Sequence, residues 1–111
     1  MGKNVLCFLE KVSQFGKEGY ALLDLFEELV EKPSIHFLEK GCFALGLLKN
    51  GGGAVRLWIE NDNIELSLHN RDGDTTYSIQ LWYERGSLST VVVGGIPPPE
   101  AKILKKYGLR I

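Results

Sequence analysis

The chain has 111 residues, and its 13 Lys and Arg against 14 Asp and Glu leave a net charge of −1. A chain of this length can bury one core, so residues 1–111 are expected to form a single domain, and a catalytic domain with a separate recognition domain is excluded. The near-neutral charge argues against the overall positive field of a non-specific nucleic-acid coat protein, although it leaves room for a local basic patch.

The first third of the chain is predicted to be helical. Apolar residues at helical spacing predict an amphipathic helix over residues 3–15, which Gly16 and Gly19 end. A second helix is predicted over residues 18–31, and Pro33 ends it because proline disfavours helical geometry in the residue before it.

Residues 34–50 fit two interpretations. We interpret them as a third helix, with Ser34 as its N-cap and Asn50-Gly51 as its stop. Gly41 and Gly46 weaken this interpretation by about 1 kcal/mol each. The alternative is a strand over residues 42–48.

A sheet is predicted to begin after Gly51-Gly52-Gly53, where the apolar period changes from 3.6 to 2. Three alternating segments, 55–60, 64–69 and 77–84, share one apolar face. A fourth strand follows over residues 88–93, where the unbroken Val91-Val92-Val93 suggests burial on both faces.

The turns set the expected register of this sheet. Asp72-Gly73 between alternating strands predicts a two-residue type I′ hairpin with Leu68 opposite Tyr77. The turn at residues 61–63 is compatible with a loop of Asn61-Asp62 or of Asp62-Asn63.

The chain is expected to end with an extended proline arm and a short helix. Pro97-Pro98-Pro99 cannot donate to a strand ladder, and residues 100–107 have the apolar spacing of a helix that Gly108 stops. The predicted fold is therefore α+β, with N-terminal helices (1–50) packed on one face of an antiparallel four-stranded meander (54–93), followed by the arm and short C-terminal helix (94–111).

The inventory of reactive side chains favours a non-enzymatic role. His36 and His69 are the two histidines, and neither histidines nor cysteines have the spacing of a metal site. Cys7 and Cys42 are expected to be buried thiols, with a disulfide between them left open. The triple glycine lacks the Lys-Ser/Thr of a phosphate loop, so no cofactor is expected.

The first candidate surface is the second face of the predicted sheet. Two tryptophans on an otherwise polar face indicate a binding surface, because indoles are enriched at binding hot spots and can also stack on bases. The alternative is that another part of the protein or a second subunit covers them. The candidate residues are Arg56, Trp58, Glu65, His69, Gln80 and Trp82.

Two charged segments form further candidates. Carboxylates at helical spacing predict an acidic stripe that could meet a basic partner, although a solvated surface is the preferred explanation. Basic residues in the C-terminal tail could contact phosphates, or could serve solubility alone. The stripe comprises Asp24, Glu27, Glu28 and Glu31, and the tail comprises Lys102, Lys105, Lys106 and Arg110.

These features lead to three functional hypotheses. The first is a non-enzymatic protein-interaction or regulatory module, expected to be a homodimer, that uses the sheet face or the acidic stripe. The alternative is a nucleic-acid-binding protein in which the sheet face and the basic tail cooperate. The third is a small enzyme or ligand-binding domain that uses His69 with Glu65 or Glu84.

The expected location is the cytoplasm. The first ten residues do not form a signal peptide, and no apolar run approaches the roughly 20 residues needed to cross a bilayer. A soluble protein without a membrane partner is therefore expected.

Overall fold

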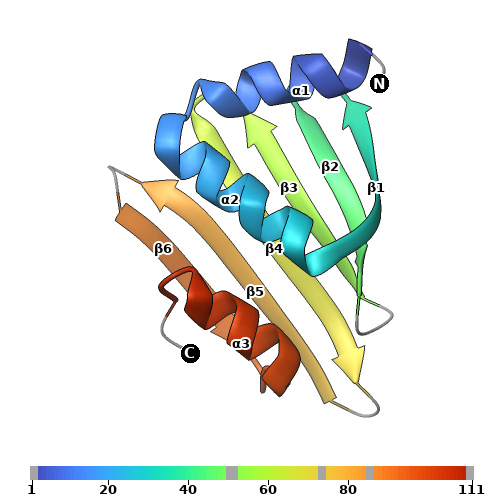
Figure 1. The fold of residues 1–111 in the computed structure, drawn as a ribbon, viewed down its shortest axis with the longest axis vertical. Coiled ribbons are helices and arrows are strands. Elements are labelled where there is room, and N and C mark those ends of the chain that lie inside the picture. Colours follow the sequence, from blue (N-terminus) through green and yellow to red (C-terminus); the bar gives the residue numbers. More distant parts are fainter. Residues whose placement is uncertain (1–2, 50–52, 73–74, 85–86, 110–111) are drawn as a thin grey trace.

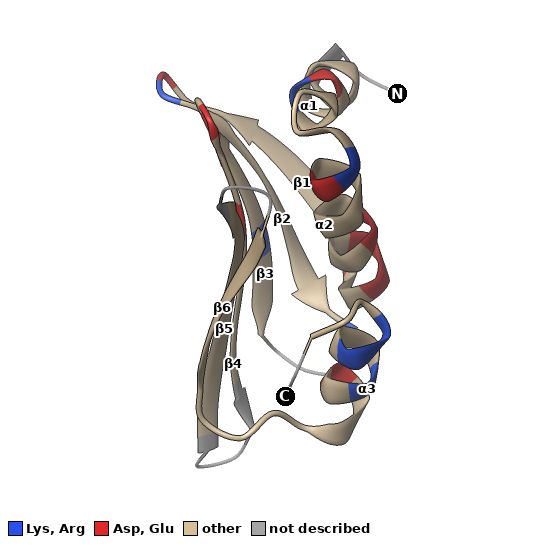
Figure 2. Ribbon diagram, turned by 90° about the vertical axis from the view of Figure 1, so that its left-hand side faces the viewer, with Lys and Arg blue, Asp and Glu red and all other residues tan. Residues whose placement is uncertain are grey.

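The helices of this protein all lie on one face of a single sheet. A computed structural model describes residues 3–49, 53–72, 75–84 and 87–109 of the chain. The helices α1 (Lys3–Ser13) and α2 (Gly16–Leu29) precede the sheet, and α3 (Pro98–Lys106) follows it. Seen from the side, the three helices form one layer and the curved sheet forms the other (Figures 1 and 2).

The sheet is an antiparallel meander in which each strand pairs with the next along the chain. It therefore has the predicted α+β architecture, but with six strands and not four. The strands are β1 (Val30–Phe37), β2 (Cys42–Leu48), β3 (Ala54–Glu60), β4 (Asn63–Asp72), β5 (Thr75–Glu84) and β6 (Ser87–Val93).

The third helix predicted over residues 34–50 is wrong, because this segment forms β1, a tight turn and β2. The Leu38 N–H donates to the Gly41 carbonyl at 2.7 Å and closes the turn. The strand alternative over residues 42–48 is confirmed. Apolar residues occupy both faces of β2, so its sequence lacks the alternation that identifies a half-buried strand.

The two N-terminal helices are confirmed, with different ends. Gly16 has a φ of +61° and begins α2, so it provides the turn between the helices. Gly19 does not end a helix, because it lies inside α2, where a Cβ would come within 2.5 Å of the Val12 carbonyl oxygen. Helix α2 ends at Leu29, and Pro33 lies within β1.

The core fills the space between the helices and the inner face of the sheet. Alternate residues of β3, β4 and β5 point toward the helices, as the period of 2 predicts. The buried side chains include Phe8, Val12, Leu22, Leu25, Phe26 and Leu29 from the helices, and Val55, Leu57, Ile59, Ile64, Leu66, Leu68, Tyr77, Ile79 and Leu81 from the strands.

The register between β4 and β5 differs from the predicted one by two residues. Leu68 pairs with Ile79 and not with Tyr77, and Asp72, predicted as a loop residue, pairs with Thr75, while Gly73 lies outside the described residues. A shift of two residues keeps the same side chains on the inner face, so the apolar pattern cannot choose between the registers. The observed register brings Asn70 opposite Tyr77, and the Asn70 amide donates to the Tyr77 hydroxyl at 3.2 Å in the buried layer.

The turn between β3 and β4 settles the alternative that the sequence left open. Glu60 pairs with Asn63, so Asn61-Asp62 is the two-residue loop. Asn61 has a φ of +48°, which asparagine tolerates better than most residues.

The C-terminal third contains two further corrections. Val91, Val92 and Val93 are 44%, 37% and 61% exposed, so β6 is not buried on both faces. Helix α3 begins at Pro98, so two of the three prolines belong to its first turn, where a missing N–H costs nothing, and the extended arm is shorter than predicted.

Candidate functional site

The face of the sheet opposite the helix layer, here called the outer face, carries all six residues of the first predicted surface. Strand alternation and register place their side chains away from the core, and no helix of the described chain covers them (Figure 2). The outer face also carries apolar side chains that the prediction did not include. These are Phe43, Leu45 and Leu47 of β2, and Val91 and Val93 of β6.

A row of side chains crosses the outer face from strand to strand. His36 of β1 pairs with Phe43, and Phe43 pairs with Trp58. The His36 and Phe43 rings stack with centroids 4.8 Å apart, and the Phe43 and Trp58 rings are 5.8 Å apart and tilted. We call these three residues the aromatic row. They form a continuous run of ring–ring contacts over β1, β2 and β3.

The second tryptophan extends this row beyond a carboxylate. Glu65 pairs with Trp58 on one side and with Trp82 on the other. The predicted neighbour of Glu65, Gln80, pairs instead with Ser67, because of the two-residue change of register. The outer face therefore presents Trp58 and Trp82, both half-buried, on either side of one acidic side chain.

Polar contacts hold the Trp58 indole in place. Its Nε1–H donates to Glu60 Oε2 at 3.1 Å, and the Arg56 guanidinium carbon lies 5.5 Å from its ring centroid. Such a cation–π contact contributes about 0.5–1 kcal/mol at an exposed site. A side chain that is already oriented loses little further freedom when a partner covers it, so these contacts favour binding through Trp58.

A desolvated hydroxyl lies at the centre of the outer face. Ser67 pairs with Arg56 and Gln80, and its Oγ is buried without a hydrogen-bond partner among the described residues. A buried polar group of this kind costs about 1–3 kcal/mol. The centre of the face is therefore polar, while apolar side chains of β2 and β6 lie at its two sides.

The acidic stripe and the basic tail, predicted as separate surfaces, contact each other. Glu28 of α2 accepts a hydrogen bond from the Tyr107 hydroxyl at 2.8 Å. It also forms an ion pair with Lys106, whose Nζ lies 3.0 Å from the carboxylate. Asp24 and Glu27 remain exposed, and Glu31 lies in β1 and not on the helix. The uniform helical stripe of four carboxylates is therefore wrong.

The protonation of this contact follows from its geometry. The hydrogen bond from Tyr107 and, next, that from Lys106 lower the pKa of Glu28. Burial, followed by the hydrogen bond to Glu28, raises the pKa of Tyr107 to about 12. Between the lowered pKa of Glu28 and the raised pKa of Tyr107, the contact therefore joins a carboxylate on α2 to a neutral phenol and an ammonium at the end of α3.

The basic tail and the sheet face do not form one surface. Helix α3 belongs to the helix layer, on the opposite side of the sheet from the tryptophans (Figure 2). Lys102 and Lys105 are exposed, Lys106 contacts Glu28, and Arg110 lies outside the described residues. A nucleic-acid strand lying on the aromatic row would therefore not meet the tail on the same face.

The acid–base pair considered for an enzyme is not assembled. His69 and Glu65 lie four residues apart on β4, which corresponds to about 13 Å along a strand. Glu84 belongs to the far end of β5, where it pairs with Ser87, whereas His69 pairs with Ser78. The described residues contain no group of three or more His, Cys, Asp or Glu side chains that could hold a metal ion.

The cysteines match the prediction in one case of two. Cys42 is buried, and this burial raises the pKa of its thiol, whereas Cys7 is exposed. Both carry free thiols, so the disulfide that the sequence left open is not present.

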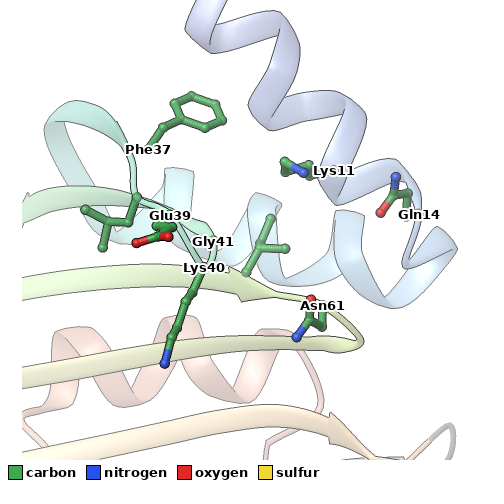
Figure 3. Close-up of a pocket in the computed structure, with 9 residues that line it drawn as sticks. Lys11, Gln14, Phe37, Glu39, Lys40, Gly41 and Asn61 are labelled. Carbon is green, nitrogen blue, oxygen red and sulfur yellow. The ribbon is translucent and has the colours of Figure 1, made fainter.

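A hollow of about 370 Å³ lies where the end of α1 faces two turns of the sheet (Figure 3). Lys11 of α1 and Gln14, which follows this helix, face Glu39 and Asn61, which come from the β1–β2 and β3–β4 turns. Its described lining includes Lys11, Glu39 and Lys40 but no histidine or cysteine, so it offers no Cys–His pair. The sequence did not predict this hollow, because the first of these turns lies in the segment predicted as the third helix.

Comparisons with protein-family models, with curated proteins and with solved structures find no match to this chain. Among the described residues, no helix is long and apolar enough to cross a membrane.

Proposed function

We propose that this protein is a non-enzymatic interaction module and that its outer face binds a protein partner. The observation that carries this proposal is the aromatic row with Trp82, which lies on a sheet face left bare by all three helices. Large aromatic side chains with a polar surround are the usual anchors of protein interfaces.

The charges of the outer face favour a protein over a nucleic acid. A single-strand binder combines aromatic side chains with a positively charged groove. Here the tryptophans have two carboxylates beside them, Glu60 bonded to Trp58 and Glu65 between the two indoles, against the single guanidinium of Arg56. A phosphate backbone would be repelled by this arrangement, whereas a protein surface of mixed charge would not.

The dimensions of the outer face fit a modest interface. Six strands spaced about 4.8 Å apart, the shortest of them seven residues long, present at least roughly 24 by 23 Å, or about 550 Å². A partner covering this face would bury on the order of 1,100 Å² in total, which lies at the lower end of specific interfaces. We therefore expect reversible binding to a surface with apolar side chains.

Site-specific photocrosslinking tests this proposal. A benzophenone amino acid replaces Gln80, which is exposed in the centre of the outer face, or Lys102, which is exposed on α3 in the opposite layer. In extracts of the natural host, we expect a discrete protein adduct from position 80 and not from position 102. The adduct should fall at least fivefold when Trp58→Ala is added.

Two outcomes would overturn the proposal. Equal adduct yields from both positions, or an adduct yield that Trp58→Ala does not change, would show that the outer face is not the binding surface. Quenching of the tryptophan emission by a single-stranded oligonucleotide, with affinity falling steeply as salt rises, would replace the protein partner with a nucleic acid.

A further inference from the structure

The sheet is open, and its two edge strands differ in a way that points to self-association. Among the described residues, β1 pairs only with β2, and β6 pairs only with β5. Each edge strand therefore leaves a row of backbone N–H and C=O groups without a strand partner. Such a row is a template for pairing with another chain unless the sequence protects it.

Strand β1 carries several protective features. Its register with β2 shifts between Glu31 and Ser34, which marks a bulge. Within the bulge, Lys32 has a φ of +52°, and Pro33 has no N–H to donate. A bulge, a lysine and a proline are the devices by which natural sheets prevent edge pairing.

Strand β6 has none of these features. Its residues, Ser87–Val93, include no charge and no proline, and its register with β5 runs without interruption from Ser78–Val93 to Glu84–Ser87. Val91, Val92 and Val93 are all more than a third exposed. Among the described residues, no other backbone segment hydrogen-bonds to its free edge.

We infer that β6 pairs antiparallel with β6 of a second copy of this chain, joining the two sheets into one. A twofold axis perpendicular to the sheet keeps both helix layers on the same side, as a continuous sheet requires. With the axis at Thr90, all seven residues overlap, Leu88 faces Val92 and Ser89 faces Val91. An uncharged strand meets no like charge when it pairs with itself, so the contact is self-complementary.

The size of this contact determines the kind of dimer. A seven-residue strand is about 23 Å long, and edge pairing buries far less than the roughly 1,600 Å² of a standard interface. The dimer is therefore reversible, and it dissociates on dilution.

Molar mass measured against concentration tests the inference. Sedimentation equilibrium of the intact chain between about 5 and 500 μM should show a rise from 12.4 kDa toward twice that mass. Val92→Lys places a charge at the edge, on the helix side of the sheet, and should weaken dimerisation at least tenfold. Leu47→Lys, the same kind of change at a 48% exposed site on the outer face, is the matched control and should leave it unchanged.

Amide exchange gives a second readout that depends on no substitution. In an unpaired edge strand, alternate N–H groups of residues 87–93 face solvent and exchange rapidly. Dimerisation should slow these alternate amides at least tenfold at high concentration. Amides of β1 should show no such dependence on concentration.

The inference fails if the mass stays at that of a monomer up to about 500 μM, or if the exchange rates of the β6 amides do not change with protein concentration. It also fails if Leu47→Lys abolishes the dimer while Val92→Lys preserves it, because the contact would then be the outer face. These results are independent of the crosslinking at Gln80, so the dimer and the interaction module can succeed or fail separately.

Discussion

Replacing Tyr77 by phenylalanine should lower the free energy of unfolding by about 1–3 kcal/mol, although it removes a single oxygen atom. Tyr77 is 1% exposed, and its hydroxyl accepts a hydrogen bond from the amide of Asn70, which is 6% exposed. Without that oxygen, the buried amide loses its acceptor and pays the cost of an unsatisfied polar group. At an unfolding entropy of roughly 0.23 kcal/mol/K for a chain of 111 residues, the melting temperature should fall by about 4–13 °C.

A double-mutant cycle with Asn70→Ala separates the hydrogen bond from other effects of the substitution. Chemical unfolding of the wild type, both single variants and the double variant should give a coupling free energy of about 1 kcal/mol or more. Tyr20→Phe, at a 46% exposed site of α2, is the control and should change stability by less than about 0.5 kcal/mol. If Tyr77→Phe is as mild as this control, or if the two changes are additive, the pair does not stabilise the fold as argued.

Three further predictions concern packing, pH and exposure. Gly46→Ala should destabilise by about 1–3 kcal/mol in urea unfolding, because the new Cβ would lie 2.6 Å from a side chain of β1, whereas Gly95→Ala meets nothing within 4 Å and should be neutral. The stabilisation that Tyr107→Phe removes should be full between about pH 5 and pH 10. Below pH 4.5 this stabilisation should decline as the pH falls toward the lowered pKa of Glu28 and the carboxylate gains a proton. Above pH 10 it should decline as the pH rises toward the Tyr107 pKa of about 12 and the phenol loses its proton. A stability difference between wild type and Tyr107→Phe that does not change with pH would contradict this. Iodide should quench the emission of both half-buried indoles, and protected emission at low concentration would show that the outer face is covered.

Much of the sheet could be predicted because β3, β4 and β5 each bury one face. Their apolar residues alternate with polar ones, so the period of 2 identifies both the strands and the inner face. The same alternation correctly placed Trp58 and Trp82 on the outer face. The register could not be predicted in this way, because Asp72-Gly73 favours one hairpin while the buried Asn70–Tyr77 pair belongs to another.

The strand β1 was missed, and β2 was predicted only as the alternative to a helix, for a different physical reason. Three of the four inner-face residues of β2 are small, namely Cys42, Ala44 and Gly46, and the side chain of Val30 occupies the space above Gly46. On its outer face, Phe43 and its neighbours are apolar as well. A strand that is apolar on both faces has no period, so the sequence could equally be interpreted as a helix.

This error also hid two of the three residues of the aromatic row. Phe43 becomes the neighbour of Trp58, and His36 that of Phe43, only when residues 34–50 form two strands. The acidic stripe was mispredicted because the partner of Glu28 is distant in the sequence. Lys106 lies 78 positions away, and no local sequence pattern indicates such a contact. A charge that is unpaired along a helix can thus be paired in the fold.

The two surfaces proposed for binding have a common origin in the placement of the helices. A meander whose helices all pack on one face leaves the other face bare, and an open meander leaves two free edges. Core packing explains the buried apolar residues of the inner face, but it does not explain Trp58, Trp82 or Leu47, which contribute nothing to that core. Nor does it explain why β1 has a bulge and a proline while β6 has neither. Both asymmetries become intelligible if the outer face and the β6 edge are contact surfaces, and if β1 is the edge that must remain unpaired.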